Sequence, residues 1–190
     1  MRTLLLCGYR SPLGLDRCPQ GRTLIERRLA ALHEYGSPVV AVLSGAFADE
    51  QLRQCPRLAD VELAYDNSGD NSGDNYGVRT SLTTNVVVGL EDRDREPFFV
   101  LPVEIPLPDR DTWNGLLEAA ESEHLPEKAS LIQAVTPQGA PWHYGFPLVV
   151  SRFGNRELRR LKELNSLLDP RLNYLHLVLP NEVASVPKAI

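Results

Sequence analysis

Short apolar runs alternate with amphipathic segments along the chain. Apolar runs bounded by glycine, proline or aspartate are typical of strands buried on both faces of a parallel sheet, whereas apolar residues that recur every three or four positions indicate helices. The alternation of the two patterns predicts an α/β fold with a doubly wound, mostly parallel sheet and right-handed crossovers. Strands are expected over residues 3–7, 38–43, 61–65, 130–135, 143–150 and 174–179, and another begins at Phe98.

Capping residues mark the ends of the expected helices. Thr23 and Glu26 have the capping-box spacing, in which a hydroxyl and a carboxylate satisfy the first free amide groups of a helix. Gly36 is placed to end the same helix. The apolar stripe of this helix is formed by Ile25, Leu29 and Leu32. Further helices are expected over 48–55, 80–90 and 112–123, the last capped by Asp109 or Asp111, and from Asn155 to Leu168.

The strand that begins at Phe98 places a carboxylate where ligands commonly bind. Pro102 has no N–H to donate to a sheet and Pro106 follows it, so the strand ends between residues 100 and 103. Glu104 therefore lies just past a carboxyl end, where open α/β sheets bind their ligands. A carboxylate in this position is either a metal ligand or the cap of the next helix, and position alone favours neither.

Composition and charge narrow the class of partner. The 190 residues are 43% hydrophobic and 24% charged, which is ordinary for a globular protein, and we expect one domain over residues 1–190. A net charge of -5 and a pI of about 5.4 argue against broad nucleic-acid or anionic-membrane binding and leave a local basic pocket open. The apolar run before Gly8 is too short for a signal peptide, and no later run approaches a membrane span. We expect a cytoplasmic protein with a small-molecule partner.

Neither the three cysteines nor the polar tract over residues 66–75 predicts a metal site. Cys7, Cys18 and Cys55 lack the spacing of a disulfide framework or a zinc site. Residues 66–75 repeat Asn-Ser-Gly-Asp and are too polar to bury enough surface to order themselves, which favours a mobile loop. Its acidic residues recur at every fourth position, and a calcium loop needs ligands at alternate positions.

The loop between the first strand and the first helix combines glycines with arginines. Glycine lets the backbone approach a ligand closely, and arginine offers planar, permanently charged donors to phosphate oxygens. The loop is not a Walker loop, because a lysine followed by serine or threonine is missing, and it lacks G-x-G-x-x-G spacing. Composition alone leaves open a phosphate-binding loop and a structural surface loop. The residues concerned are Gly8, Gly14, Gly21, Arg10, Arg17 and Arg22.

The order of several motifs carries a family resemblance. Leu6-Cys7-Gly8-Tyr9 and Gly21-Arg22-Thr23-Leu24-Ile25-Glu26 are similar to a strand ending in Leu-Ala-Gly-Gly and to a later Gly-x-x-Leu-Ile-Glu. Val100-Leu101-Pro102-Val103-Glu104-Ile105-Pro106-Leu107 is similar to Val-Leu-Pro-Cys-Asp-Met-Pro-Leu, the most specific of these matches. Across almost its whole length the chain resembles the nucleotidyltransferase family that includes molybdenum cofactor guanylyltransferase and molybdenum cofactor cytidylyltransferase.

The resemblance implies a fold and a reaction. The fold is a three-layer, Rossmann-like α/β domain of the nucleotide-diphospho-sugar-transferase type, with helices on both faces of the sheet. The reaction transfers a nucleoside monophosphate from a nucleoside triphosphate to a phosphorylated acceptor such as molybdopterin, with pyrophosphate leaving and Mg²⁺ holding the oxygens. Guanine and cytosine both stay open as the base.

The resemblance also implies site residues. Arg17, assisted by Arg10 or Arg22, would hold the triphosphate, and Glu104 would bind the metal ion. The nucleotide itself would be contacted by Leu6, Cys7, Gly8, Gly14, Asp66, Gly77 and Ser81, with Gly89 in the helix that faces it.

The sequence departs from the family pattern at the proposed metal site. The family's metal-binding aspartate is Glu104 here, Leu13 lies near its loop arginine, and the carboxylate before its final Thr-Pro is absent before Pro187. A weaker metal clamp would remove most of the catalysis in phosphoryl chemistry. A second hypothesis is therefore a nucleotide-binding or regulatory protein that has lost turnover and acts through a partner chain, and a third is a protein without a nucleotide site.

Overall fold

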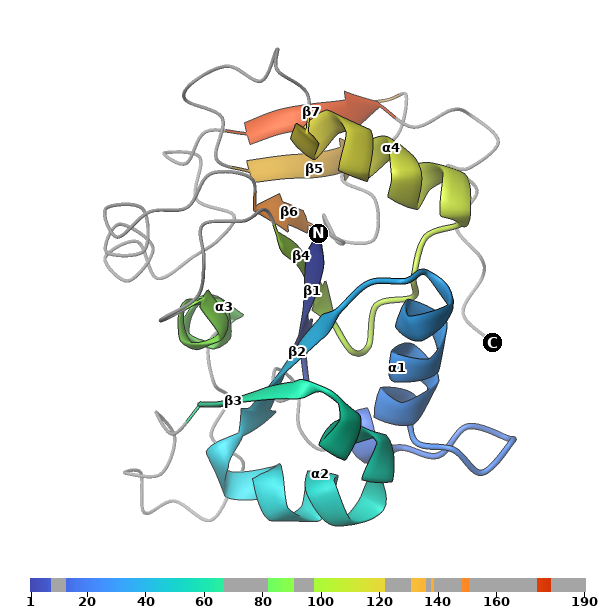
Figure 1. The fold of residues 1–190 in the computed structure, drawn as a ribbon, viewed down its shortest axis with the longest axis vertical. Coiled ribbons are helices and arrows are strands. Elements are labelled where there is room, and N and C mark those ends of the chain that lie inside the picture. The colour runs from blue at the N-terminus through green and yellow to red at the C-terminus, as the bar shows by residue number, and fades with distance from the viewer. Residues whose placement is uncertain are drawn as a thin grey trace.

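The computed structural model describes residues 1–7, 13–66, 82–90, 98–121, 131–135, 138, 148–150 and 174–178 (Figure 1). Its strands are β1 (Arg2–Leu6), β2 (Val39–Ser44), β3 (Glu62–Asp66), β4 (Phe98–Pro102), β5 (Leu131–Val135), β6 (Leu148–Val150) and β7 (Tyr174–Val178). Its α-helices are α1 (Leu24–Glu34), α2 (Ala48–Gln54), α3 (Leu82–Leu90) and α4 (Arg110–Glu121), and its 3-10 helices are η1 (Leu13–Leu15), η2 (Gly45–Phe47) and η3 (Pro56–Asp60).

All these strands form one sheet in the order β3-β2-β1-β4-β6-β5-β7. Neighbouring strands are parallel except at β6, which is antiparallel to both β4 and β5. In the parallel half, Leu6 lies opposite Pro102 and Ser44 lies opposite Asp66, so β3, β2, β1 and β4 end along one line. We call this line, marked by Leu6, Ser44, Asp66 and Pro102, the carboxyl edge.

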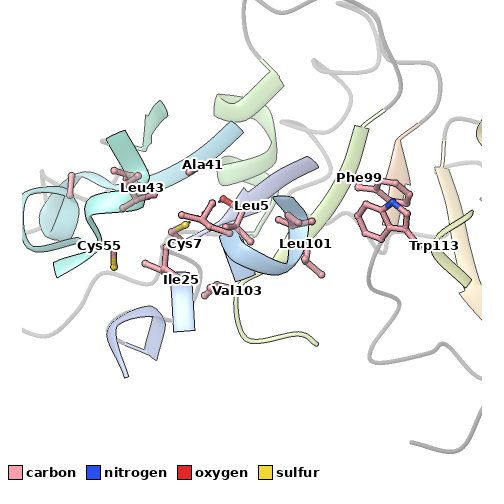
Figure 2. Packing of buried hydrophobic residues seen from close by; sticks show 14 of the residues in the cluster. Leu5, Cys7, Ile25, Ala41, Leu43, Cys55, Phe99, Leu101, Val103 and Trp113 are labelled. Carbon is pink, nitrogen blue, oxygen red and sulfur yellow. Dashed lines mark hydrogen bonds between the residues drawn. The ribbon is translucent and has the colours of Figure 1, made fainter. Parts of the chain in front are cut away.

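Helices cover both faces of the sheet, as expected. Because side chains alternate along a strand, one face carries Leu5, Leu43 and Leu101, which pack with α1, α2 and α4 in a single core cluster (Figure 2). The other face is covered by α3, which contacts β1, β2 and β3 and lies across the sheet from α1 in Figure 1. The three-layer α/β architecture with a mostly parallel sheet is thereby confirmed.

The capping expectations are confirmed at α1. The Thr23 hydroxyl accepts a hydrogen bond from the Glu26 amide at 3.2 Å, and the Glu26 carboxylate accepts one from the Thr23 amide at 3.1 Å. Gly36, just past the end of α1, has φ +68°, which glycine adopts without strain. At α4 the cap is Asp109, whose carboxylate accepts a hydrogen bond from the Thr112 amide at 2.8 Å.

Several expectations fall outside the described residues. These are the helix from Asn155 to Leu168, residues 143–147 of the sixth expected strand, and the polar tract after Asp66. Among the strands that are described, β6 and β7 begin or end within a few residues of the expected positions. None of the helices that the structure describes is long and apolar enough to cross a lipid bilayer.

Candidate functional site

The ends of β1 and β4 lie side by side at the carboxyl edge. Leu6 pairs with Pro102, and the Val103 amide donates to the Leu6 carbonyl at 3.1 Å, so the pairing continues one residue past β4. The chain then turns, with the Ile105 amide donating to the Pro102 carbonyl at 3.0 Å. The loop that follows β1 therefore leaves the sheet next to the turn that carries Glu104, as the nucleotide hypothesis requires.

Glu104 lies in this turn with its carboxylate directed inward. Both carboxylate oxygens are buried. Burial raises the pKa of the neighbouring Cys7 thiol, and the charges of Cys55 and Glu104 raise it further, which places the carboxylate close to the end of β1. Since α4 is capped by Asp109, Glu104 is not the cap of the following helix, one of the two alternatives that the sequence left open.

The donor set at the carboxyl edge fits a magnesium ion only together with a substrate. Asp66 ends β3 at the same edge, but β2 and β1 lie between it and β4, a separation of roughly 14 Å at the usual strand spacing, so Asp66 and Glu104 cannot share an ion. The residues that the structure describes include no group of three or more His, Cys, Asp or Glu side chains that could hold a metal. Mg²⁺ commonly binds one or two carboxylates plus substrate phosphates and water. A single glutamate would therefore be enough if the substrate supplied the phosphate ligands.

Asp66 is buried at the end of β3 and bonded to α3. Its side chain accepts a hydrogen bond from Asn85 Nδ2 at 2.8 Å, and the two residues are 1% and 0% exposed. Further along α3, a Cβ on Gly89 would lie 2.2 Å from Leu4 Cδ1. Gly89 was expected in a helix that faces a nucleotide, but this glycine faces β1, because only a residue without a side chain lets α3 approach the sheet so closely.

The backbone at the end of β1 is fixed by its neighbours. The Cys7 amide donates to the Val42 carbonyl at 2.9 Å, and the Cys7 carbonyl accepts from Gln51 Nε2 at 2.9 Å. A Cβ on Gly14 would lie 3.2 Å from the same carbonyl, so glycine lets the returning loop pack against the strand end. Each of the carbonyls of Leu6 and Cys7 thus keeps only one lone pair for a ligand.

Arg17 and Arg22 lie on a short hairpin before α1. The Cys18 amide donates to the Arg22 carbonyl and the Gly21 amide to the Cys18 carbonyl, both at 2.8 Å, and Gly21 has φ +76°. Arg17 Nη1 donates to the Gly21 carbonyl at 2.8 Å, while both arginines are exposed. This hairpin projects beyond the start of α1 in Figure 1. The expected site residues Gly8, Arg10, Gly77 and Ser81 lie outside the described residues.

Arg28 is a buried charged residue that the sequence analysis missed. It is 9% exposed, and its Nε donates to the Val103 carbonyl at 3.1 Å, directly before Glu104. The pKa of Arg28 is lowered to about 10, chiefly by burial and then by the charge of Arg27, while Cys18 and Glu104 act in the opposite direction. The sequence did contain a signal, because Arg28 falls on the same helical face as Ile25, Leu29 and Leu32.

Solved structures of low sequence identity share the fold. Rv0371c from Mycobacterium tuberculosis H37Rv, in a structure of its complex with manganese, matches with a TM-score of 0.60 and 14% identity, over 94% of this chain and 89% of that one. A 4-diphosphocytidyl-2C-methyl-D-erythritol synthase from Anaerococcus prevotii DSM 20548 matches with a TM-score of 0.55 and 11% identity, over 95% and 90% of the two chains. No curated protein matches the sequence significantly.

The family comparison covers most of the chain. Residues 15–172 match the family described as "MobA-like NTP transferase domain". This range begins at the end of η1, just before the arginine-bearing hairpin, includes β2, β3 and β4 with the Glu104 turn, and extends past β6. The chain therefore belongs to the MobA-like nucleotidyltransferase family.

Proposed function

We propose that this chain is a magnesium-dependent nucleotidyltransferase that transfers a nucleoside monophosphate from a nucleoside triphosphate to a phosphorylated small molecule, such as molybdopterin. The observation that carries the proposal is the pairing of Leu6 with Pro102, which joins the start of the first loop and the Glu104 turn at one sheet edge. Ligands of open α/β sheets bind at such an edge. The presence of manganese in the Rv0371c structure supports a divalent ion in this family.

In the proposed reaction, an oxygen of the acceptor phosphate attacks the α-phosphorus of the triphosphate. The bond from the α-phosphorus to the bridging oxygen breaks, and pyrophosphate leaves with the electron pair. Arg17, with Arg10 or Arg22, would hold the triphosphate, because guanidinium groups match phosphate oxygens in charge and geometry. Glu104 would bind the magnesium ion, which neutralises charge on the phosphate oxygens when bound. Leu6, Cys7, Gly8, Gly14, Asp66, Gly77 and Ser81 would surround the nucleotide.

A pyrophosphate-release assay tests this proposal. The protein is incubated with each nucleoside triphosphate, magnesium and a set of phosphorylated acceptors. Glu104→Gln should abolish release, because the amide cannot replace the charge of a metal-binding carboxylate. Glu62→Gln is the matched control, since Glu62 is a partly exposed residue at the opposite end of β3 that pairs with Arg2. Absence of pyrophosphate in every combination, or equal activity of Glu104→Gln and wild type, would overturn the proposal.

The burial of the Glu104 oxygens favours a second candidate function, a nucleotide-binding or regulatory protein without turnover that acts through a partner chain. An ion could reach these oxygens only if the side chain rotates or the residues around it move.

Calorimetry separates the two functions. Tight nucleotide binding that requires magnesium supports the enzyme, and nucleotide binding that does not depend on magnesium supports the second candidate. A ligand at 100 times its dissociation constant adds about 2.7 kcal/mol of stability. A protein that no nucleotide stabilises has neither function.

A further inference from the structure

Arg28 is held at the carboxyl edge by one atom of its side chain. Its Nε donates to the Val103 carbonyl at 3.1 Å, which ties α1 to the residue before Glu104. Within the described part of the chain this is the only hydrogen bond that Arg28 makes. A guanidinium group has five N–H donors, so the four on the two terminal nitrogens are not used by the described residues.

The terminal nitrogens of Arg28 belong to a mostly buried side chain. The residue is 9% exposed, and among the described residues neither nitrogen is a fully enclosed atom without a hydrogen-bond partner. Burying a permanent charge is unfavourable, and the lowered pKa of Arg28, to about 10, reflects this. Arg28 still carries its charge at neutral pH. A buried arginine whose terminal donors are not used by the described residues is suited to bind an anion.

The surroundings favour a phosphate group as that anion. Arg27 precedes Arg28 on α1, and the charge of Arg27 acts on Arg28 strongly enough to lower its pKa. Two neighbouring groups raise the pKa of Arg28, first Cys18 and then Glu104, the proposed magnesium ligand. A guanidinium near a carboxylate that binds magnesium matches the charge pattern of a metal-bound phosphate, whose oxygens accept paired N–H donors. A carboxylate ligand has only two oxygens, so it would have none left for the metal ion once both accept hydrogen bonds from Arg28.

We propose that Arg28 is a phosphate-binding residue of this site, held by Val103 through Nε so that both terminal nitrogens face the phosphate oxygens of a substrate. This inference rests on the proposed function for the identity of the substrate. The phosphate belongs either to the nucleoside triphosphate or to the acceptor, and the two sources share the same recognition chemistry.

Calorimetric titration of the full chain with inorganic pyrophosphate and with inorganic phosphate, each in magnesium and in EDTA, tests the proposal. Arg28→Met should weaken binding by about 10- to 100-fold, the effect of losing charge-assisted hydrogen bonds. Arg28→Lys should weaken binding less, because it keeps the charge but loses the paired donors. Arg57→Met is the control and should stay within a few-fold of wild type, since Arg57 is exposed in η3 and is not part of the proposed site. Loss of pyrophosphate binding alone indicates the triphosphate, and loss of phosphate binding alone indicates the acceptor.

Two results would overturn the proposal. One is wild-type protein that binds neither anion, and the other is binding by both Arg28 variants that equals wild type. If Arg28→Met does not fold, as judged by circular dichroism, the lysine variant decides. The titration does not measure turnover, so the two proposals can fail separately. If the protein binds pyrophosphate through Arg28 but releases none from a nucleotide, this inference stands and the proposed function is wrong. If turnover is the same in wild type and both Arg28 variants, the proposed function stands and this inference is wrong.

Discussion

Asn85 donates a hydrogen bond from Nδ2 to Oδ2 of Asp66 at 2.8 Å, inside the protein. Asp66 is the last residue of β3, and Asn85 lies in the first half of α3. The bond therefore joins α3 to the carboxyl edge, although the two residues are 19 positions apart in the sequence. A hydrogen bond to a charged carboxylate is stronger than one between neutral groups, and more so when both partners are buried.

Replacing Asn85 with leucine, which has a similar size, should lower the free energy of unfolding by about 1.5 to 3 kcal/mol, the usual contribution of a hydrogen bond to a charged group. Urea denaturation measures this loss. Asn114→Leu is the control, because Asn114 is an exposed asparagine in α4, and it should change stability by less than about 0.5 kcal/mol. Equal losses in the two variants would mean that the bond to Asp66 contributes nothing.

Gly89→Ala should destabilise the protein although alanine is the better helix former. The added methyl group would lie 2.2 Å from Leu4 Cδ1, and Leu4 is fully buried, so the helix or the leucine must move. Overpacking of this kind costs about 1 to 3 kcal/mol, more than the roughly 1 kcal/mol gained in helix propensity.

The matched test for Gly89 is a double-mutant cycle with Leu4→Ala. Removing the leucine side chain makes room for the methyl group, so the two substitutions together should destabilise less than the sum of their separate effects. Thermal denaturation of all four proteins measures the coupling. Additive effects would show that Gly89 and Leu4 do not contact each other in solution.

Thr23→Ala should cost about 1 to 2 kcal/mol of stability, since it removes the N-cap of α1. The same hydroxyl lies 3.1 Å from Cys55 Sγ, so the variant also leaves that thiol without this contact. Thr23→Ser retains the hydroxyl and should recover most of the loss in chemical denaturation. A serine variant as unstable as the alanine variant would assign the effect to the methyl group instead.

Stability should fall at alkaline pH because of Cys7. Burial raises the pKa of this thiol above its usual value of 9.0, so the unfolded chain loses the proton at a lower pH than the folded protein does. The stability contribution is complete below about pH 9 and decreases above it, at up to about 1.4 kcal/mol per pH unit. Cys7→Ala should reduce this slope in urea titrations between pH 8 and pH 10.5. The pKa of Cys55 is also raised, chiefly by burial, so part of the slope should persist.

Glu104→Asp distinguishes a metal ligand from a structural carboxylate. If Glu104 binds magnesium, aspartate should retain magnesium-dependent nucleotide binding, whereas Glu104→Gln should weaken it by about tenfold or more. Aspartate keeps the charge that a metal ligand needs although it is one methylene shorter, whereas glutamine keeps the length and loses the charge. Calorimetry with and without magnesium measures both. Magnesium dependence that survives in the glutamine variant would assign the ion to other groups.

Local patterns in the sequence predicted much of the fold correctly. The strands that end at Leu6, Ser44, Asp66 and Pro102 were recognised from short apolar runs and the residues that interrupt them. The α1 cap followed from the spacing of Thr23 and Glu26. These features depend on residues that are close in sequence, so they are determined before any distant contact forms.

The environment of the candidate site depended partly on a local cap and partly on a contact between distant residues. Sequence spacing left Glu104 as either a helix cap or a metal ligand, and the bond from Thr112 to Asp109 removed the first alternative. No expectation from the sequence concerned Arg28, whose Nε donates to the Val103 carbonyl, far away in the chain. The contact of Arg28 with Val103 follows from the packing of α1 beside the end of β4, which joins residues 75 positions apart.

The sequence by itself determined which segments are strands and helices, where α1 begins, and that a carboxylate follows a buried strand. Only the tertiary structure decided that Leu6 lies opposite Pro102, that Asp66 is bonded to Asn85, and that Arg28 reaches the turn before Glu104. The physical reason is that secondary structure follows from the intrinsic preferences and spacing of nearby residues. The partners of a buried polar group are set by strand order and helix packing, which join residues far apart in the chain.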